Sequence, residues 1–283
     1  MNIRSVRKKI KSVANVKKIT RAMQLVSAVK MRKSQLAALE AAPYQDTLTG
    51  IVSRVSTRMD ASASNLMIPG HASRRLAILV MTNKGLCGAF NMNLMRYIMS
   101  EPEIKNTDFI TIGKKATMFA AKMRGEVLAD YSTAGQDILA SVPAIINQVI
   151  SLFTASQTAQ VTVYYNKFVS ALKYEPTYEL LLPASKISSG LAKEAAGDYM
   201  MEPRGAEIID FLIRTYIEER LRYVILQSEA GEHSARMVAM KNATDNATEL
   251  IYNLTAVRNK LRQQKITYEL LDMITAKESV ESN

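Results

Sequence analysis

The chain has 283 residues and is 48% hydrophobic and 22% charged, as in an ordinary folded protein. Its single cysteine, Cys87, excludes an intrachain disulfide. Its two histidines, His71 and His233, lie far apart, so we expect neither a metal site nor a cofactor. No apolar run reaches the roughly 18 residues of a transmembrane helix, and the N-terminus has no apolar signal-peptide core.

The positive charge is concentrated at the N-terminus. Residues 1–33 hold 11 basic residues and no acidic one, which equals the whole net charge of +11. They are Arg4, Arg7, Lys8, Lys9, Lys11, Lys17, Lys18, Arg21, Lys30, Arg32 and Lys33. Such a segment needs an acidic protein, nucleic acid or an anionic membrane as its partner. A basic-zipper mode of DNA binding fits the charge, but the charges share one helix with an apolar stripe, which favours pairing within the protein.

Residues 3–57 have the pattern of one long helix. Apolar residues recur three and four apart, and the stripe resumes after a one-step phase slip near Val16. Its members are Ile3, Val6, Ile10 and Val13, followed by Ile19, Met23 and Val26. Pro43 removes a backbone donor, so we expect a kink or local unwinding there.

The middle of the chain alternates strands with helices after a small, polar linker at 58–73. Strands are predicted at 75–82, 108–113, 126–131, 160–165 and 177–182, and helices at 90–99, 114–124 and 136–155. This alternation indicates a largely parallel sheet covered on both faces. An irregular segment at 184–205, with several glycines and prolines, follows the sheet.

Residues 206–276 predict a second long helix, about 105 Å long at about 1.5 Å per residue. Only one glycine, Gly231, and no proline falls within it. Its predicted heptad seam comprises Ile217, Leu221 and Val224, then Met240, Ala243, Ala247, Leu250, Leu254, Val257 and Leu261. A helix of this length is much longer than the diameter of a small domain. We therefore expect it to pair with the N-terminal helix as an antiparallel coiled coil.

Polar residues cluster at the middle of this seam, at Lys241, Asn242, Thr244, Asp245 and Asn246. In one interpretation they form hydrogen bonds across the coiled coil and fix its register. In the other, this polar middle has a role other than packing of the coiled coil. The pattern alone leaves both open.

The loop Gly85-Leu-Cys-Gly88 follows a strand, as a phosphate-binding loop would. It matches neither G-x-G-x-x-G nor G-x-x-x-x-G-K-[ST], which favours a tight strand-to-helix turn over nucleotide binding. Cys87 has no histidine nearby in sequence, so a nucleophilic role is not favoured either. We recognise no catalytic triad or acid pair and expect no catalytic residue.

Together these segments predict an α/β fold class, in which terminal helices form a long antiparallel coiled coil and a Rossmann-like domain with a largely parallel sheet lies between them. The expected boundaries are 1–57, 74–190 and 206–283. From the residues alone, such a chain is a coiled-coil adaptor or a nucleic-acid-binding protein with a basic arm. Binding to random DNA that weakens steeply with salt would favour the latter.

A series of short motifs runs along the whole chain. They are Lys18-Ile-Thr-Arg-Ala-Met23, Lys30-Met-Arg-Lys-Ser-Gln35, Gly85-Leu-Cys-Gly88, Tyr165-Asn-Lys-Phe168, Ala235-Arg-Met-Val-Ala-Met-Lys-Asn-Ala-Thr-Asp-Asn246 and Ile266-Thr-Tyr-Glu-Leu-Leu-Asp272. Their sequence and order resemble the gamma subunit of the F-type ATP synthase in its bacterial form. The chain departs from that family at Ala276-Lys277, where Gly-Ala is usual, and it lacks the cysteine pair of the chloroplast form.

The resemblance implies a central-stalk rotor subunit without catalytic residues of its own. In the family, the shaft occupies the central hole of a hexamer of alpha and beta subunits, and its foot rests on the membrane c-ring beside the epsilon subunit. Proton flow turns the rotor, and each shaft orientation stabilises a different conformation of each beta subunit, which drives ATP synthesis. The implied protein is peripheral, on the cytoplasmic side of the bacterial inner membrane, present in one copy per complex, and does not bind nucleic acid.

The resemblance also implies which residues make contacts. Those facing the acidic loop of a beta subunit would be Lys17, Lys18, Arg21 and Met23. Near the tip of the shaft, Arg262 and Gln263 would contact a beta loop. The foot that meets the c-ring and epsilon would include Tyr199, Glu202 and Pro203.

Overall fold

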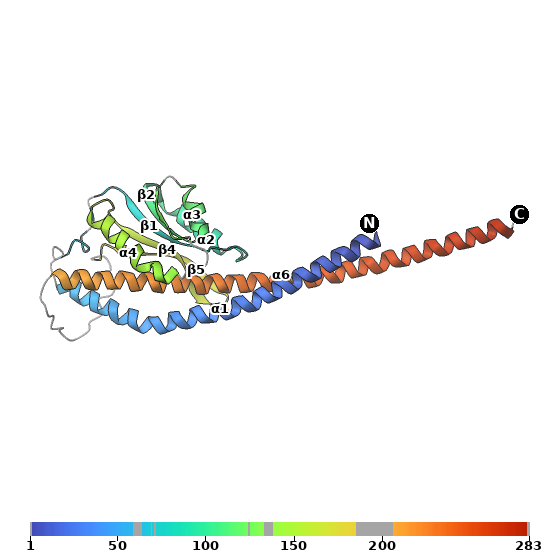
Figure 1. The fold of residues 1–283 in the computed structure, drawn as a ribbon, viewed down its shortest axis with the longest axis horizontal. Coiled ribbons are helices and arrows are strands. Elements are labelled where there is room, and N and C mark those ends of the chain that lie inside the picture. The colour runs from blue at the N-terminus through green and yellow to red at the C-terminus, as the bar shows by residue number, and fades with distance from the viewer. Residues whose placement is uncertain are drawn as a thin grey trace. The chain divides into compact units, whose positions relative to one another are not determined.

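The computed structural model describes residues 2–58, 64–68, 70, 72–123, 125–132, 138–184 and 206–281. Its longest elements are two helices, α1 (Ile3–Arg58) and α6 (Ala206–Glu281). The chain divides into two compact units. We call residues 1–27 with 237–283 the helical unit, and residues 28–236 the mixed unit. Both long helices contribute to both units (Figure 1).

The mixed unit contains a five-stranded sheet. Its strands are β1 (Arg75–Val80), β2 (Thr107–Ile112), β3 (Val127–Asp130), β4 (Val161–Ser170) and β5 (Lys173–Leu182). Their order is β3-β2-β1-β4-β5, and only β5 is antiparallel to its neighbour. β1 lies at the centre and its apolar run is almost wholly buried, as expected of a strand covered on both faces. The predicted largely parallel sheet is confirmed.

Helices cover both faces of the sheet. On one face, α2 (Phe90–Ser100) and α3 (Lys114–Ala120) bury Leu94, Ile98 and Phe119, with the short 3-10 helix η2 (Pro102–Asn106) following α2. On the other face, α4 (Ile138–Thr154) shares a core with the parts of α1 and α6 that belong to the mixed unit (Figure 1). Every α6 residue from 215 to 236 is buried or half-buried, so this part of α6 is a core helix.

Within the mixed unit, two contacts show that α1 and α6 run antiparallel. The Ser34 hydroxyl donates to Glu229 Oε2 at 3.5 Å, and Thr49 forms a side-chain hydrogen bond with Tyr216. Residue numbers therefore rise along α1 as they fall along α6. The predicted antiparallel pairing of the terminal helices is confirmed.

The buried face of α1 follows a strict heptad from end to end. Its members, all buried or half-buried, are Val6, Ile10, Val13, Lys17, Thr20, Gln24, Ser27, Met31, Ser34, Ala38, Ala41, Gln45, Leu48, Val52 and Val55. The phase slip expected near Val16 is wrong, because Ile19 and Val26 are 59% and 57% exposed. The seam continues without a slip, but through polar and small side chains that carry no hydrophobic signal.

The seam predicted on α6 needs a similar correction. Its buried or half-buried face runs through Met240, Thr244, Ala247, Ile251, Leu254, Arg258 and Leu261. Leu250 and Val257, which were expected on it, are 47% and 41% exposed. The earlier part is as predicted, since Ile217, Leu221 and Val224 are fully buried.

Pro43 does not interrupt α1, which continues through it as α-helix. The local unwinding expected there is therefore wrong. Proline removes one backbone hydrogen bond, but buried seam residues on both sides, Ala38 and Gln45, keep the helix in its packed register.

Candidate functional site

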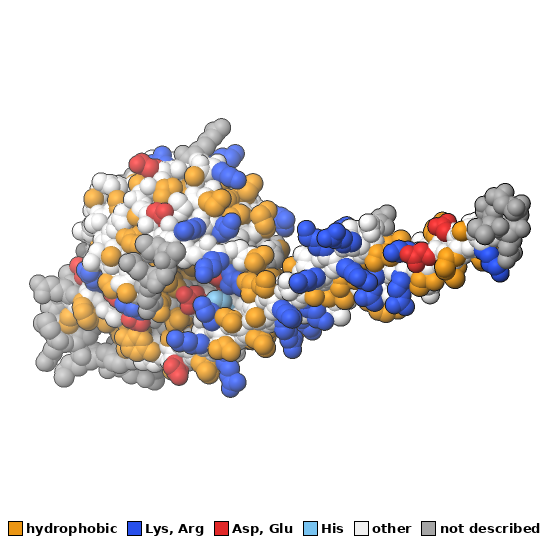
Figure 2. Space-filling view, turned by 45° about the vertical axis from the view of Figure 1, so that its right-hand side comes forward, with side chains coloured by type: hydrophobic (Ala, Val, Ile, Leu, Met, Phe, Trp, Pro, Cys, Tyr) orange, Lys and Arg blue, Asp and Glu red, His pale blue; other side chains and the backbone are white. Residues whose placement is uncertain are grey.

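The outer surface of the helical unit is basic. Lys18 and Arg21 are exposed, whereas Lys17 occupies a half-buried seam position and Met23 is half-buried beside the seam. Figure 2 shows Lys and Arg side chains gathered on the visible side of the paired helices. Arg21 Nη1 donates to Gln24 Oε1 at 3.0 Å, a neutral partner that leaves its charge uncompensated. This surface can therefore receive an acidic partner.

The polar patch in α6 divides into two groups. Thr244 is buried, and its hydroxyl lies within hydrogen-bond distance of the buried Thr20 hydroxyl on α1. The other four patch residues, Lys241, Asn242, Asp245 and Asn246, are exposed. Thr244 thus forms a bond across the coiled coil, and the remaining residues are free to face a partner.

The C-terminal part of α6 is a single helix with no covering from the described residues. Every residue from 262 to 277 is exposed, Arg262 and Gln263 included. The large apolar side chains among them are Ile266, Tyr268, Leu270, Leu271, Met273 and Ile274. Apolar side chains exposed at this density mark an interaction surface. The three residues expected at the foot, Tyr199, Glu202 and Pro203, lie outside the described residues.

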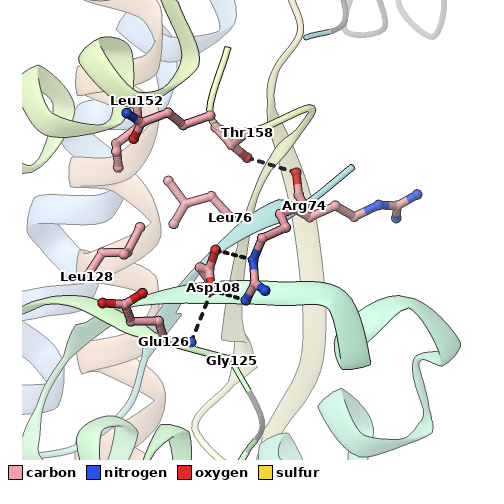
Figure 3. A pocket seen from close by; sticks show the side chains of 10 residues that line it. Arg74, Leu76, Asp108, Gly125, Glu126, Leu128, Leu152 and Thr158 are labelled. Atoms are coloured by element: carbon pink, nitrogen blue, oxygen red, sulfur yellow. Dashed lines mark hydrogen bonds and ion pairs between the residues drawn. The ribbon is translucent and has the colours of Figure 1, made fainter. Parts of the chain in front are cut away.

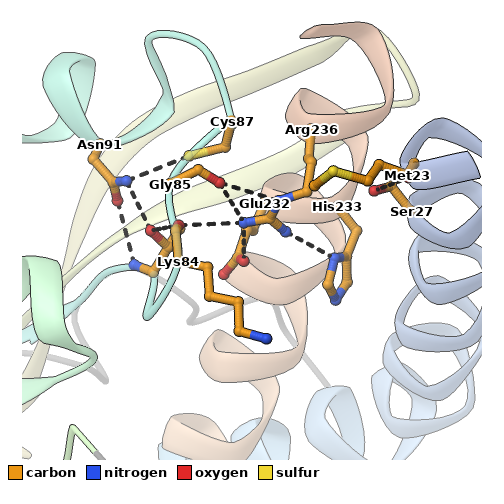
Figure 4. Close-up of polar contacts among 10 residues, drawn as sticks. Met23, Ser27, Lys84, Gly85, Cys87, Asn91, Glu232, His233 and Arg236 are labelled. Carbon is orange, nitrogen blue, oxygen red and sulfur yellow. Dashed lines mark hydrogen bonds and ion pairs between the residues drawn. The ribbon is translucent and has the colours of Figure 1, made fainter. Parts of the chain in front are cut away.

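The loop that follows β1 is held against α6 by one arginine (Figure 4). Arg236 Nη2 donates to the backbone oxygens of Lys84 and Gly85, both at 3.3 Å, and to Glu232 Oε1 at 2.6 Å. The loop turns through left-handed backbone conformations at Leu86 and Gly88, with φ of 63° and 60°. Its carbonyl oxygens are thus engaged by a guanidinium, which gives the loop a packing role.

Cys87 in this loop is buried rather than poised for chemistry. It is 3% exposed, and burial raises the pKa of its thiol. Asn91 Nδ2 lies 3.4 Å from its sulfur (Figure 4). A reactive cysteine needs the opposite shift, so the geometry does not support a nucleophile here.

Two further ionisable groups border Arg236. Burial raises the pKa of the Glu232 carboxyl, although Arg236, Lys30 and Lys84 act against it. Burial, followed by the charges of Arg236 and Lys30, lowers the pKa of His233 to about 4. Sequence patterns do not reveal this cluster. The spacing of four between Glu232 and Arg236 suits a helical ion pair, but nothing local indicates that Arg236 is buried and Glu232 half-buried.

A cavity of about 540 Å³ lies at the amino ends of β1, β2 and β3 (Figure 3). Arg74 Nε donates to Asp108 Oδ2 at 2.7 Å, which neutralises both groups, and Leu76, Leu128 and Leu152 form apolar walls. Ligands of open α/β sheets bind at the carboxyl ends of the strands, so this cavity is at the edge opposite to the usual site. Within the described ranges, no cluster of His, Cys, Asp or Glu could hold a metal, and no helix could cross a membrane.

The fold and these surfaces define a protein built on two long antiparallel helices, whose exposed basic and apolar side chains suit the binding of partners, with a largely parallel α/β layer beside the helices of the mixed unit. A family model described as ATP synthase matches residues 2–280. The chain belongs to the ATP synthase gamma chain family.

Relatives agree with this assignment, and solved structures share the fold. The ATP synthase gamma chains of Akkermansia muciniphila and Geobacter sp. strain M21 are 36% and 35% identical, and each alignment covers 99% of both chains. A chain from the Euglena gracilis mitochondrial ATP synthase OSCP/F1/c-ring structure matches with a TM-score of 0.64 and 20% identity, over 99% of this chain and 95% of that one. A chain from the Tetrahymena thermophila mitochondrial ATP synthase central stalk and c-ring matches with a TM-score of 0.58 and 22% identity, over 80% and 99%.

Proposed function

We propose that this chain is the central-stalk rotor subunit of a proton-translocating F-type ATP synthase. In this role it transmits rotation between the membrane c-ring and the catalytic beta subunits. The family assignment supports the proposal, as do solved neighbours described as central stalk and c-ring. Its partners are the alpha–beta hexamer, the epsilon subunit and the c-ring, and it is present in one copy.

The observation that carries the proposal is the uncovered end of α6. Residues 262–277 are exposed on a helix that bears large apolar side chains on several sides. Apolar side chains on several sides of one helix favour a partner that surrounds it. A ring of subunits around the helix meets that requirement. Because the side chains differ around the helix, each orientation stabilises a different conformation of each surrounding subunit.

If α6 lies at the centre of such a ring, particular residues contact particular subunits. Lys17, Lys18, Arg21 and Met23 face an acidic loop of a beta subunit, and their charge or half-exposed position in the helical unit supports this. Arg262 and Gln263, both exposed, contact a beta loop near the tip of α6. The foot at the c-ring and epsilon includes Tyr199, Glu202 and Pro203.

The chain itself carries no catalytic residue and uses no cofactor in this proposal. Its domains are the helices of 1–57 and 206–283 and the Rossmann-like domain of 74–190. The protein is peripheral on the cytoplasmic side of the bacterial inner membrane. The work transmitted is about 2.3 kcal/mol per elementary charge per 100 mV of membrane potential.

The test is purification of the tagged chain from its native membranes. We expect stoichiometric alpha, beta, epsilon and c subunits, ATPase activity in the purified sample, and no binding of ATP to the isolated chain in calorimetric titration. Recovery of nucleic acid in place of ATPase subunits, with binding that weakens steeply as salt rises, would support the alternative of a DNA-binding protein and overturn the proposal.

A further inference from the structure

Two arginines of α6 bond to different elements of the α/β layer, which is the five-stranded sheet with its helices α2, α3 and α4. Arg220 Nε donates to Glu179 Oε2 on β5 at 2.6 Å, and the two side chains are only 26% and 23% exposed. Arg222 Nη1 donates to the backbone oxygen of Leu139 on α4 at 3.0 Å. We call these two bonds the lateral contacts of α6.

Arg220 and Arg222 leave α6 on nearly opposite sides. Two positions correspond to about 200° around an α-helix of 3.6 residues per turn. Leu221 between them is fully buried, in the core that α6 shares with the sheet and α4. The helix therefore packs on the layer through Leu221, while one arginine reaches β5 on one side and the other reaches α4 on the other side.

Neighbouring side chains orient both lateral contacts. Glu179 also accepts a hydrogen bond from the hydroxyl of the buried Tyr165 on β4. Arg222 Nη2 donates to Glu218 Oε1 of its own helix at 2.8 Å, which holds the guanidinium in one direction. Charge-assisted bonds of this kind are stronger than neutral ones.

The acceptor on α4 has a local origin in the sequence. In a regular α-helix, the Leu139 oxygen would accept from the backbone N–H four residues later. Residue 143 is a proline inside α4 and has no N–H to donate. Arg222 donates to this oxygen from another helix.

Rotation of α6 about its own axis changes the two lateral contacts in opposite ways. Rotation in one sense draws Arg220 away from β5, and rotation in the other sense draws Arg222 away from α4. Hydrogen bonds weaken steeply when their angle departs from the optimum, whereas the apolar packing around Leu221 is non-directional. The lateral contacts therefore oppose rotation of α6 against the layer in both senses.

We propose that Arg220 and Arg222 are positioning residues that hold the α/β layer and α6 together against rotation about the helix axis, so that both turn as one body. This inference rests on the proposed function, in which α6 transmits rotation. If α6 twisted freely beside the layer, part of the rotation would be stored as elastic twist before it reached the catalytic subunits. The alternative is that these contacts only add a little stability, as surface ion pairs do.

Distances between two spin labels in the full chain test this restraint directly. One label replaces Met118 on α3 and the other replaces Phe211 on α6, which are 58% and 67% exposed. We expect Arg220→Met with Arg222→Met to widen the distribution of label distances about twofold. The control pair has its labels at Met99 on α2 and Met118 on α3, both within the layer, and its distribution should stay unchanged.

The single variants give a result that a loss of stability alone does not produce. Arg220→Met leaves only the contact with α4, and Arg222→Met leaves only the contact with β5. The mean label distance should therefore shift in opposite directions in the two variants. Arg220→Lys with Arg222→Lys keeps both cations as donors and should recover part of the restraint. Thermal unfolding checks that each variant folds.

The inference is overturned if the double methionine variant keeps the parent distribution, or if the two single variants shift the mean distance in the same direction. The purified complex supplies the link to rotation. With the hexamer immobilised, a bead attached through Met118→Cys should show about twice the angular variance in the double methionine variant. Equal variance in an intact, rotating complex counts against this inference alone. Failure of the parent chain to assemble with ATPase subunits counts against the proposed function, and the label distances still decide whether the restraint exists.

Discussion

The hydroxyl oxygens of Thr20 on α1 and Thr244 on α6 lie 2.7 Å apart, although 224 residues separate them in sequence. Both side chains are less than one-tenth exposed, at 8% and 7%. Each hydroxyl also lies near a carbonyl of its own helix, Lys17 O at 3.1 Å and Met240 O at 2.8 Å. Only one register of the two helices brings these hydroxyls together, so the pair fixes the alignment of the coiled coil within the helical unit.

Valine substitutions test this pair. Thr20→Val or Thr244→Val alone should cost about 1 kcal/mol, since one buried hydroxyl loses its partner across the coil. The double variant should cost less than the two single variants together, because both polar groups are then replaced by apolar groups of the same shape. Urea unfolding of the four proteins measures the coupling, and strict additivity would show that the hydroxyls do not interact.

Met23→Lys separates an interface role from a structural one. Met23 is half-buried beside the seam, so a lysine there can extend its ammonium into water and should leave thermal unfolding nearly unchanged. Beside Lys18 and Arg21, it should bind an acidic beta-subunit loop in only some rotor orientations and lower the protons pumped per ATP hydrolysed. Val6→Lys is the control, since Val6 is fully buried and its replacement should destabilise the chain. If Met23→Lys unfolds at a temperature as low as Val6→Lys does, the interface role is refuted.

Arg236→Ala should destabilise the mixed unit by about 3 kcal/mol, because the half-buried Glu232 would lose its cation. The same change frees the carbonyl oxygens of Lys84 and Gly85. Adding Glu232→Gln to Arg236→Ala should recover part of the loss, since the unpaired charge is then gone. Chemical unfolding of the full chain measures both. Equal stability of the single and double variants would show that the charge of Glu232 plays no part.

His233 should make the protein sensitive to acid. Its folded pKa of about 4 lies below the ordinary value of 6.5. The unfolded chain therefore binds a proton that the folded chain does not, and the stability from neutral His233 is complete above about pH 6.5 and lost as pH falls toward about 4. His233→Gln should flatten the stability profile across this interval.

Glu232 acts in the opposite direction, because its raised pKa lets the folded carboxyl bind a proton more readily than the unfolded one. Glu232→Gln should therefore steepen the loss of stability in acid. Unfolding midpoints between pH 7 and pH 4 compare the two variants with the parent. Parallel profiles for all three proteins would show that the cluster around Arg236 does not titrate in this range.

The amino-acid sequence by itself determined the elements that depend on local periodicity. The strand at Arg75–Val80 is an uninterrupted apolar run, and α6 has a long helical pattern that a single glycine does not break. The reason for that glycine lies in the tertiary structure, because a Cβ at Gly231 would come within 3.1 Å of the Phe90 ring. The strand ends at the β4–β5 hairpin were underestimated, since the pairing continues past Tyr165 and begins before Thr177, with Lys167 opposite Glu175 and Phe168 opposite Tyr174.

Only the tertiary structure decided which faces of the long helices are buried. A hydrophobic pattern assigns Ile19, Val26 and Leu250 to the seam, yet they are exposed, while Thr20 and Thr244 are buried. The physical reason is that burial at a seam depends on the opposite helix, and small polar residues can occupy it once they bond to each other. The same holds for Arg236, whose role comes from carbonyl oxygens on a loop about 150 residues earlier in the chain. Such pairings are absent from any local pattern, because they exist only after the chain has folded.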